Sequence, residues 1–399
     1  MKIRNIIWSS FIIFIFTAIM IIVIFIKEKD VHLSLEGRNA NNFILPTVEN
    51  VMNGEFQDYF ELAYKDQFIN REKLFKIYRK LDNALHYISS RNHTPYTLYQ
   101  IGDNIYRFDG ASNYLLEFPI IRNSFKEEDI ITSANNINDL ANKYEDINFY
   151  VYDGFRLNMV DWFDKDNFIT SYGIYNRDLF HNSLNSNIQY YSYYPSDLDE
   201  YTKYFFKTDP HWNTHGSYEF GYKKIVDMIN NNYHNLEYLE PIDEHIYNGY
   251  SYYGQYGRGS LYSTTPDIFS DLKFHLPEYK TVVNGVEQKY DHVDEYENGT
   301  IESYMMPYIY SNLHGNDEKE VEFDFNTNNG RVLLAFVDSY ASPIKYLIAS
   351  HFDKAIFIDL RIYTDFDIDE YVNKYGVTDI LYLEYYGTLY NPSYIINID

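Results

Sequence analysis

An unbroken apolar run near the start of the chain, from Ile6 to Ile26, is its most distinct pattern. A helix over this run would be about 31 Å long at a rise of about 1.5 Å per residue, which matches a bilayer core. A secretory signal peptide has an apolar stretch of only about 7–15 residues, followed by a small-residue cleavage site that is not evident here. We therefore predict a retained membrane anchor over residues 1–26, with a cleaved signal as the alternative.

The charges beside this run do not decide its orientation. Lys2 and Arg4 precede it and Lys27 and Lys29 follow it, so the basic residues are balanced. The tail before the run is very short and the large remainder follows it. We expect a cytoplasmic N-terminus and a soluble part outside the cytoplasm, on a single-pass membrane protein.

Residues 27–50 show no periodicity and are interpreted as a stalk. From Val51 to Leu81, apolar residues recur every three to four positions, which predicts helix. The soluble domain is predicted to cover residues 51–399, because nothing within them resembles a linker.

The most regular pattern lies near the end of the chain, where short apolar runs alternate with amphipathic stretches. The pattern predicts strands over Val332–Val337, Ala355–Leu360 and Thr378–Tyr386, with helices over Pro343–Ser350 and Ile368–Tyr375 between them. Ile147–Tyr152 predicts a further buried strand. Alternating strands and helices are typical of βαβ units, so we predict an α/β domain with a parallel sheet flanked by helices. Residues 231–330 are rich in Tyr, Asn and Gly and are predicted to be a loop-rich insertion.

Composition excludes several classes of function. The chain has 399 residues and a formal net charge of −25, which disfavours binding to a phosphate backbone, so no nucleic acid partner is expected. It has no cysteine, which excludes thiolate catalysis and thiolate metal sites. Its 45 tyrosines suit stacking on sugar rings, although a general compositional bias explains them equally well.

Ser339 follows the strand predicted at Val332–Val337 and precedes a predicted helix. Ligands of open α/β sheets bind beyond the carboxyl ends of the strands, and a helix start there directs N–H groups at a developing oxyanion. The alternative is that Ser339 only caps the helix.

A second candidate segment contains Asp209, Pro210 and His211. Proline favours extended backbone, so Asp209 and His211 should project to the same side, where the carboxylate can accept the Nδ1 proton and leave Nε2 as a base. One alternative is a purely structural pair. Another is a metal site that includes His215, although the two histidines are not expected to share one helix face. We predict no metal and no cofactor.

These two segments, FFKTDPHWNTHG and LLAFVDSYASPIKYLIASHFDKAIFIDLR, resemble the DHHW proteins and the related alginate acetylation proteins. The resemblance implies an SGNH-hydrolase-like domain in which the Asp-x-His pair precedes the serine. It assigns Asp209, His211 and Ser339 to a catalytic triad. Pro210 departs from the DHHW pattern, which has His at that position, and the oxyanion hole of ordinary SGNH enzymes cannot be placed.

Four further residues are candidates for substrate binding: Trp212, Arg258, Arg361 and Tyr340. Arg258 belongs to the segment Tyr253–Ser260, whose backbone N–H groups are candidates for the oxyanion hole. The alternative for Arg258 is a solvated loop charge. The alternative for Arg361 is a salt bridge between strand ends.

The resemblance implies O-acyl transfer, with acetyl as the expected group, to a cell-surface or secreted polysaccharide. A membrane-bound O-acyltransferase would be the partner that delivers acyl groups across the membrane. The alternatives are a carbohydrate deacetylase or esterase with the same triad, and a non-catalytic polysaccharide-binding assembly protein.

Overall fold

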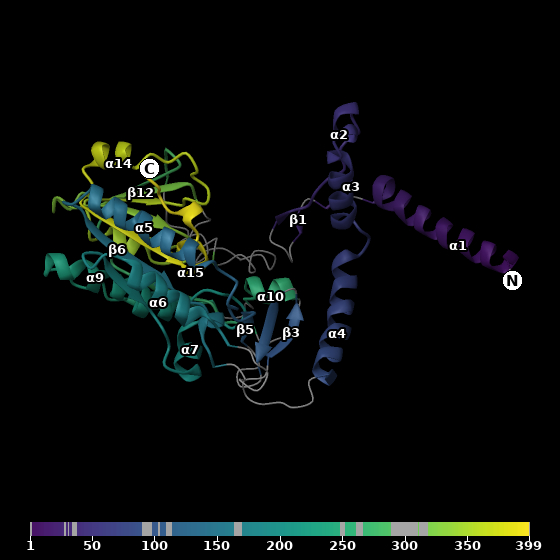
Figure 1. The fold of residues 1–399 in the computed structure, drawn as a ribbon, viewed down its shortest axis with the longest axis horizontal. Coiled ribbons are helices and arrows are strands. Elements are labelled where there is room, and N and C mark those ends of the chain that lie inside the picture. The colour runs from purple at the N-terminus through teal and green to yellow at the C-terminus, as the bar shows by residue number, and fades with distance from the viewer. Residues whose placement is uncertain are drawn as a thin grey trace.

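The computed structural model describes residues 2–27, 29–30, 32–33, 38–89, 98–102, 104–108, 114–162, 170–247, 252–260, 266–288, 310 and 318–398. Helices α1 to α4 stand to one side of a large α/β body (Figure 1). The candidate residues Asp209, His211 and Ser339 belong to this body.

An eight-stranded sheet forms the centre of the body, in the order β11-β10-β12-β14-β13-β15-β6-β7. Neighbouring strands from β14 to β7 are parallel, whereas β10, β11 and β12 are antiparallel. The strands are β6 (Asn148–Gly154), β7 (Gln189–Ser192), β10 (Lys280–Val283), β11 (Val286–Glu287), β12 (Glu320–Asp324), β13 (Val332–Val337), β14 (Lys354–Ile358) and β15 (Asp379–Tyr385).

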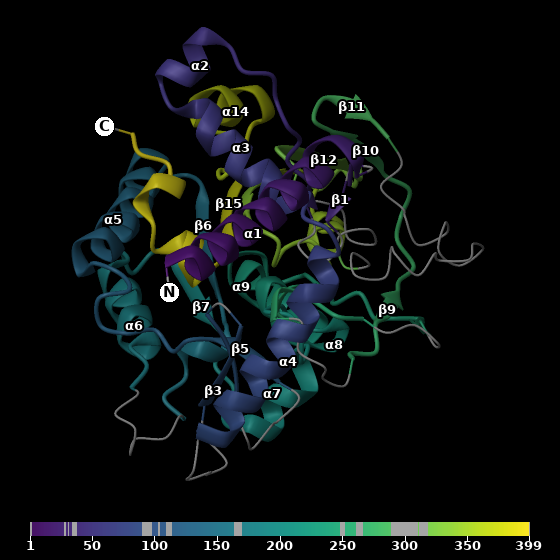
Figure 2. The same ribbon diagram turned by 90° about the vertical axis from the view of Figure 1, so that its right-hand side faces the viewer.

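The sheet is covered on both faces, as its continuous apolar strands require. Figure 2 shows α5 (Glu127–Lys143) and α6 (Gly173–Ser183) on one side of β6 and β7. On the other side, α9 (Lys223–Tyr233) packs on the same two strands. The predicted α/β fold, with helices flanking a central sheet and an apolar N-terminal helix, is confirmed.

The predicted alternation near the chain end is also confirmed, since α13 (Lys345–Ala349) and α14 (Ile368–Tyr375) separate β13, β14 and β15. Among the described residues, the body has four other short helices: α7 (Leu198–Tyr204), α8 (Thr214–Gly216), α10 (Gln255–Ser260) and α15 (Tyr386–Leu389). A small antiparallel sheet is formed by β3 (Leu98–Gly102), β4 (Ile105–Phe108) and β5 (Leu115–Glu117).

The described parts of residues 231–330 consist mainly of loops and short strands. Strands β8 (Asp243–Ile246) and β9 (Ser270–Lys273) pair with each other. Strands β10, β11 and β12 extend the central sheet at one edge. The sheet is parallel from β14 to β7, as predicted, and the antiparallel strands β10, β11 and β12 widen it at this edge.

The N-terminal region begins with α1 (Lys2–Ile21) and a π-helical turn over Ile22–Ile26. Among the described residues, Ile7–Phe25 is the one helical stretch long and apolar enough to cross a membrane, which fits an anchor or a signal sequence. The helix predicted over Val51–Leu81 is divided into α2 (Val48–Met52), α3 (Glu55–Asp66) and α4 (Arg71–Ser89). Left-handed backbone causes the breaks, at Gly54 with φ 86° and Asn70 with φ 52°.

The segment predicted as a stalk makes contacts of its own. Strands β1 (His32–Leu33) and β2 (Arg38–Asn39) pair within it. The side chain of Gln67 accepts a hydrogen bond from the backbone N–H of Asp30 and donates one to its carbonyl, both at 2.9 Å. Asp66 accepts two hydrogen bonds from Asn41, at 2.9 Å from the backbone N–H and 2.7 Å from the amide side chain.

Candidate active site

Asp209 and His211 lie between α7 and α8, on a bent segment that an antiparallel bridge between Phe205 and Trp212 closes into a loop. Their side chains project to the same side, as the i, i+2 spacing predicts. Asp209 Oδ1 lies 2.5 Å from His211 Nδ1 and also accepts the backbone N–H of His211 at 3.1 Å. The carboxylate therefore fixes both the position and the tautomer of the ring.

Ser339 lies immediately beyond β13, at the carboxyl end of the parallel strands. Its Oγ lies 2.8 Å from His211 Nε2, the ring nitrogen that faces away from Asp209. Asp209 and His211 are 4% and 8% exposed, whereas the serine is half-buried. The chain thus brings a carboxylate, an imidazole and a hydroxyl into one hydrogen-bonded line that ends at an accessible atom.

The alternative role of Ser339 as a helix cap does not match the structure. Helix α13 begins at Lys345, and its N-cap residue is Ile344, which makes no side-chain capping bond. A series of turns separates Ser339 from this helix.

These turns also engage the backbone N–H groups after Ser339, which were expected to stabilise an oxyanion. The N–H of Tyr340 donates to Asp338 Oδ1 at 2.9 Å, and the N–H of Ser342 donates to the carbonyl of Ser339 at 3.3 Å. The expectation that a helix start would direct free N–H groups at the site was therefore wrong, because the turns bind these N–H groups internally.

The second oxygen of Asp209 is held by the segment Tyr253–Ser260 and the residue before it. Tyr252 donates its hydroxyl to Asp209 Oδ2 at 3.0 Å, and the N–H of Gln255 donates to the same oxygen at 2.8 Å. Thr208 accepts the N–H of Gly254 at 2.9 Å through its hydroxyl. The Gly-rich segment, which we considered for an oxyanion hole, here supports the carboxylate from behind.

The electrostatics of Asp209 follow from these contacts. Burial alone would raise the pKa of the carboxyl group, but the charge of His211 and the hydrogen bonds from His211 and Gln255 outweigh it. Together they lower the pKa of Asp209 below its ordinary value. Asp209 is therefore an anion at neutral pH and can stabilise a positive charge on His211.

Two tyrosines enclose the ring of His211. Tyr310 stacks on it with a centroid distance of 4.7 Å, and Tyr340 lies at 5.0 Å in a tilted arrangement. The hydroxyl of Tyr310 donates to the carbonyl of Ser339 at 3.1 Å, so Tyr310 contacts both His211 and Ser339. The hydroxyl of Tyr340 donates to the carbonyls of Phe155 and Pro210, at 2.8 and 2.7 Å.

Two of the residues predicted to bind substrate lie beneath the site. Trp212 is 2% exposed and Tyr340 is fully buried. The two rings pack edge to face on each other, with centroids 5.1 Å apart. Neither ring faces solvent, so in this structure both support the loop that carries His211.

The two candidate arginines are held by neighbouring groups. Arg258 donates to the carbonyl of Tyr253 at 2.9 Å. Arg361 forms a bidentate pair with the buried carboxylate of Asp359, at 2.9 and 2.6 Å. Arg361 is thus held in a salt bridge, but with a residue that follows the same strand, β14, and not between two strand ends.

His215 has a different partner from the Asp209–His211 pair, because its Nε2 lies 3.2 Å from the carboxylate of Glu244 on β8. Within the described residues, no group of three or more His, Asp or Glu side chains is arranged to hold a metal ion.

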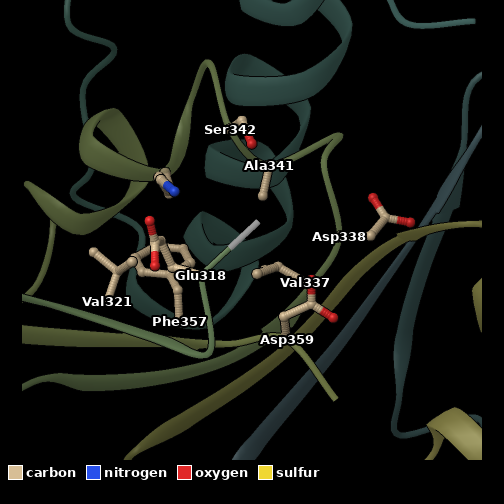
Figure 3. A pocket seen from close by; sticks show the side chains of 9 residues that line it. Glu318, Val321, Val337, Asp338, Ala341, Ser342, Phe357 and Asp359 are labelled. Atoms are coloured by element: carbon tan, nitrogen blue, oxygen red, sulfur yellow. The ribbon is translucent and has the colours of Figure 1, made fainter. Parts of the chain in front are cut away.

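A small hollow lies beside the turn that carries Ser339 (Figure 3). Asp338, Ala341 and Ser342 from this turn line one part of it, and Phe357 and Asp359 line another. The Asp338 carboxylate points away from the middle of the hollow and accepts the N–H of Tyr385 at 2.8 Å. The hollow thus has both charged and apolar lining residues, and Ser339 is not one of them.

Sequence reasoning did not identify Tyr252, Gly254 or Tyr310 as parts of this site. The sequence does indicate a functional role for the Gly-rich segment that contains Gly254, but as a candidate oxyanion hole and not as a support for Asp209. Tyr252 and Tyr310 had none, since each is one tyrosine among 45 in a stretch without periodicity.

No protein-family model matches the sequence, and no curated protein matches it. Solved structures do match the fold. A structure of Bacillus cereus PatB1 with a sulfonyl adduct has a TM-score of 0.55 at 18% identity and covers 71% of this chain and 98% of its own. A second structure of PatB1 has a TM-score of 0.56 at 20% identity and covers 69% of this chain and 95% of its own.

A DHHW family protein from Eubacterium siraeum has a TM-score of 0.53 at 17% identity and covers 73% of this chain and 93% of its own. At these identities the comparison demonstrates a shared fold. The resemblance to DHHW proteins that the two sequence segments indicate is confirmed at this level.

Proposed function

We propose that this chain is an extracytoplasmic enzyme that transfers an O-acyl group, most simply acetyl, to a hydroxyl of a polysaccharide. One observation carries the proposal: His211 bridges Asp209 and the hydroxyl of Ser339, with distances of 2.5 and 2.8 Å. These are the distances at which a base can take a serine proton.

The reaction would proceed in two steps. Ser339 Oγ attacks the carbonyl carbon of the acyl donor while its proton moves to His211 Nε2. The tetrahedral intermediate collapses as His211 returns the proton to the leaving oxygen of the donor, which leaves an ester on Ser339. A sugar hydroxyl then attacks this ester, gives its proton to His211 and departs with the acyl group, while the serine regains a proton.

Asp209 would act through His211 in both steps. Its lowered pKa keeps it ionised, so its negative charge stabilises the imidazolium that each step creates. The support from Tyr252 and Gln255 prevents the carboxylate from rotating away.

The shared fold adds support from a separate source. A sulfonyl adduct forms when a nucleophile attacks an electrophilic sulfonyl group, and PatB1 has been solved with one. The DHHW and alginate acetylation proteins that this sequence resembles suggest acetyl as the group and a polysaccharide as the acceptor. Helix α1 would anchor the domain beside a membrane-bound O-acyltransferase that supplies acyl groups from the cytoplasm.

Water in place of the sugar hydroxyl would make the same site an esterase or deacetylase. The two reactions share the acyl-enzyme and differ only in the acceptor of the second step. Exclusion of water from the loaded site therefore decides which reaction occurs.

Mass spectrometry of the purified chain after exposure to p-nitrophenyl acetate tests the proposal. We expect one added acetyl group on the peptide that contains Val337-Asp338-Ser339-Tyr340, and no adduct in Ser339→Ala. Addition of glycan should discharge the adduct with the appearance of acetylated sugar, whereas discharge to free acetate alone supports the esterase. A binding protein without chemistry would never acquire the adduct.

A further inference from the structure

Helix α4 carries its apolar side towards solvent. Six large side chains on it are between 49% and 69% exposed: Leu74, Ile77, Tyr78, Leu81, Leu85 and Ile88. At about 100° per residue they occupy one continuous stripe along the helix. A stripe of this size on a soluble helix normally faces the core.

The buried residues of α4 lie outside this stripe, and two of them are charged. Arg71 and Arg79 are 9% and 6% exposed, and Arg79 lies 3.6 Å from Asp82. The helix packs against β3 of the body. The contact with the body thus leaves the apolar stripe exposed.

A row of basic residues borders the stripe. Lys73, Lys76 and Lys80 are exposed, and the same rotation of about 100° per residue places them along one edge of the apolar side. The helix has five basic residues, at 71, 73, 76, 79 and 80, and two acidic ones, at 72 and 82, which gives 5 − 2 = +3. The whole chain carries −25, so α4 is a basic element on an acidic protein.

The start of α4 is tied to the place where the chain leaves α1. Gln67, four residues before α4, is bonded to Asp30 through both of its amide atoms. Asp30 is only four residues beyond Ile26, a span of at most about 14 Å. Gln67 and its neighbour Asp66 are fully buried, so this junction is a packed contact.

Helices α1 and α4 lie on the same side of the α/β body (Figure 1). Helix α1 projects from the side of α3 and α4 that lies away from the α/β body (Figure 1). Viewed from that side, α1, α3 and α4 all lie in front of the body (Figure 2). Val48 and Met52 of α2, 83% and 82% exposed, add apolar surface at the other end of α3 (Figure 1).

We propose that α4 lies on the outer surface of the membrane that α1 crosses, with its apolar stripe in the headgroup–acyl boundary and its lysines on anionic lipid headgroups. An amphipathic helix with a basic border binds such a surface through buried apolar area and charge attraction. The lysine stems extend along the apolar side while their ammonium groups remain at the headgroups. The inference goes beyond acyl transfer and does not depend on the chemistry of Ser339.

A second copy of the chain is the competing occupant, since Leu74, Ile77, Leu81 and Ile88 also follow a coiled-coil spacing. The membrane is favoured because the hydrogen-bonded junction brings α4 to the bilayer surface within a single chain. The basic border matches anionic lipid, whereas it would repel an identical border on another copy that packs in parallel.

The absence of cysteine makes a direct test possible, because a single introduced cysteine is a unique label site. The full chain is placed in phosphatidylcholine–phosphatidylglycerol nanodiscs with a spin label at Leu81→Cys, Leu85→Cys, Lys76→Cys or Glu370→Cys. Glu370, exposed on α14 of the body, is the control. We expect labels 81 and 85 to be more accessible to oxygen than to a water-soluble nickel chelate, and labels 76 and 370 to show the reverse.

A label at Leu81 as accessible to the nickel chelate as the label at Glu370 would overturn the proposal. Dipolar coupling between Leu81 labels on two copies, with loss of oxygen accessibility, would replace the membrane by a second copy. The charge component is tested with the triple variant Lys73→Gln, Lys76→Gln, Lys80→Gln and with phosphatidylcholine alone. The triple variant and the phosphatidylcholine nanodisc should each leave label 81 less deeply immersed in the bilayer. An unchanged immersion depth of label 81 in both experiments would contradict the role of anionic lipid.

Discussion

Gly254 lies so close to Asp209 that a β-carbon on Gly254 would come within 2.2 Å of the Asp209 β-carbon and 2.4 Å of its Oδ2. Atoms do not approach so closely without a shift of one of the groups. Glycine is therefore required here by the close approach of the chain to the carboxylate, and not by an unusual backbone angle.

We expect Gly254→Ala to displace Asp209 and, through it, His211. A displacement of about 1 Å at a reacting group can cost about 100-fold in rate, so acyl transfer should fall by about this factor. Gly259→Ala is the matched control, because its β-carbon would meet only the flexible tip of Ile105, at 3.2 Å. Acetylation rates and melting temperatures of both variants check the prediction, and an active Gly254→Ala enzyme would contradict it.

Tyr252→Phe should weaken the site without removing any member of the triad. It deletes the hydroxyl that donates to Asp209 Oδ2 at 3.0 Å and leaves a buried carboxylate oxygen with one bond fewer. We expect a loss of about 1–3 kcal/mol in the free energy of unfolding, together with a lower kcat. Tyr114→Phe, which deletes a buried hydroxyl bonded to the carbonyl of Thr202, should lose stability but keep kcat. Equal kcat values in the two variants would argue against a positioning role for Tyr252.

Asp209 should contribute to stability in a pH-dependent way. Since its pKa is lower in the folded protein than in the unfolded chain, its contribution is complete above about pH 4 and is lost as the pH falls towards the folded-state value. Denaturant unfolding from neutral pH to about pH 3 should therefore show a steeper acid loss for the wild type than for Asp209→Asn. Asp199→Asn, at an exposed position on α7, should retain the wild-type slope.

Ser339, His211 and Asp209 should lose activity as a unit. Groups that act in one step give strongly non-additive losses, so Ser339→Ala and His211→Ala should each be almost as inactive as the triple variant. Ser339→Ala deletes one hydrogen bond, to His211 at 2.8 Å, and should cost about 1 kcal/mol of stability. Rates near wild type in a folded Ser339→Ala protein would refute the assignment.

If residues 1–26 are a membrane anchor, protease treatment of intact cells should reveal it. Residues 1–26 should remain in the mature protein, with all that follows outside, so added protease should release a fragment that starts beyond Lys27. A mature N-terminus downstream of Ile26 would indicate a cleaved signal instead.

Much of the α/β body can be predicted because its signals are local. Val332–Val337 is a continuous apolar run of strand length, and the amphipathic stretches after it have helical spacing. The spacing of Asp209 and His211 around Pro210 predicts that their side chains share one side. The position of Ser339 after a strand then predicts the edge of the sheet at which the three meet.

The remaining features depend on contacts between distant parts of the chain. The approach of Gly254 to Asp209 and the stack of Tyr310 on His211 join segments 45 and 99 positions apart (254 − 209 and 310 − 211), and no periodicity encodes them. Strand β12 does alternate, with Val321 and Phe323 buried, but so short an alternation does not reveal which strand it pairs with. The burial of Trp212 likewise follows from how the loop closes over Tyr340.

The bonds of Asp30 and Asn41 to the end of α3 have a consequence for how the enzyme would meet its polymer. A flexible linker of 24 residues, 27–50, would let the domain move through a wide volume above the membrane. A linker that is hydrogen-bonded at both positions is instead rigid, so it holds the domain at one height above the membrane and at one tilt. Ser339 would then lie at a constant height above the membrane. A polysaccharide chain that emerges from the membrane would be modified as it passes this height. Sugars that have moved farther out would not be modified.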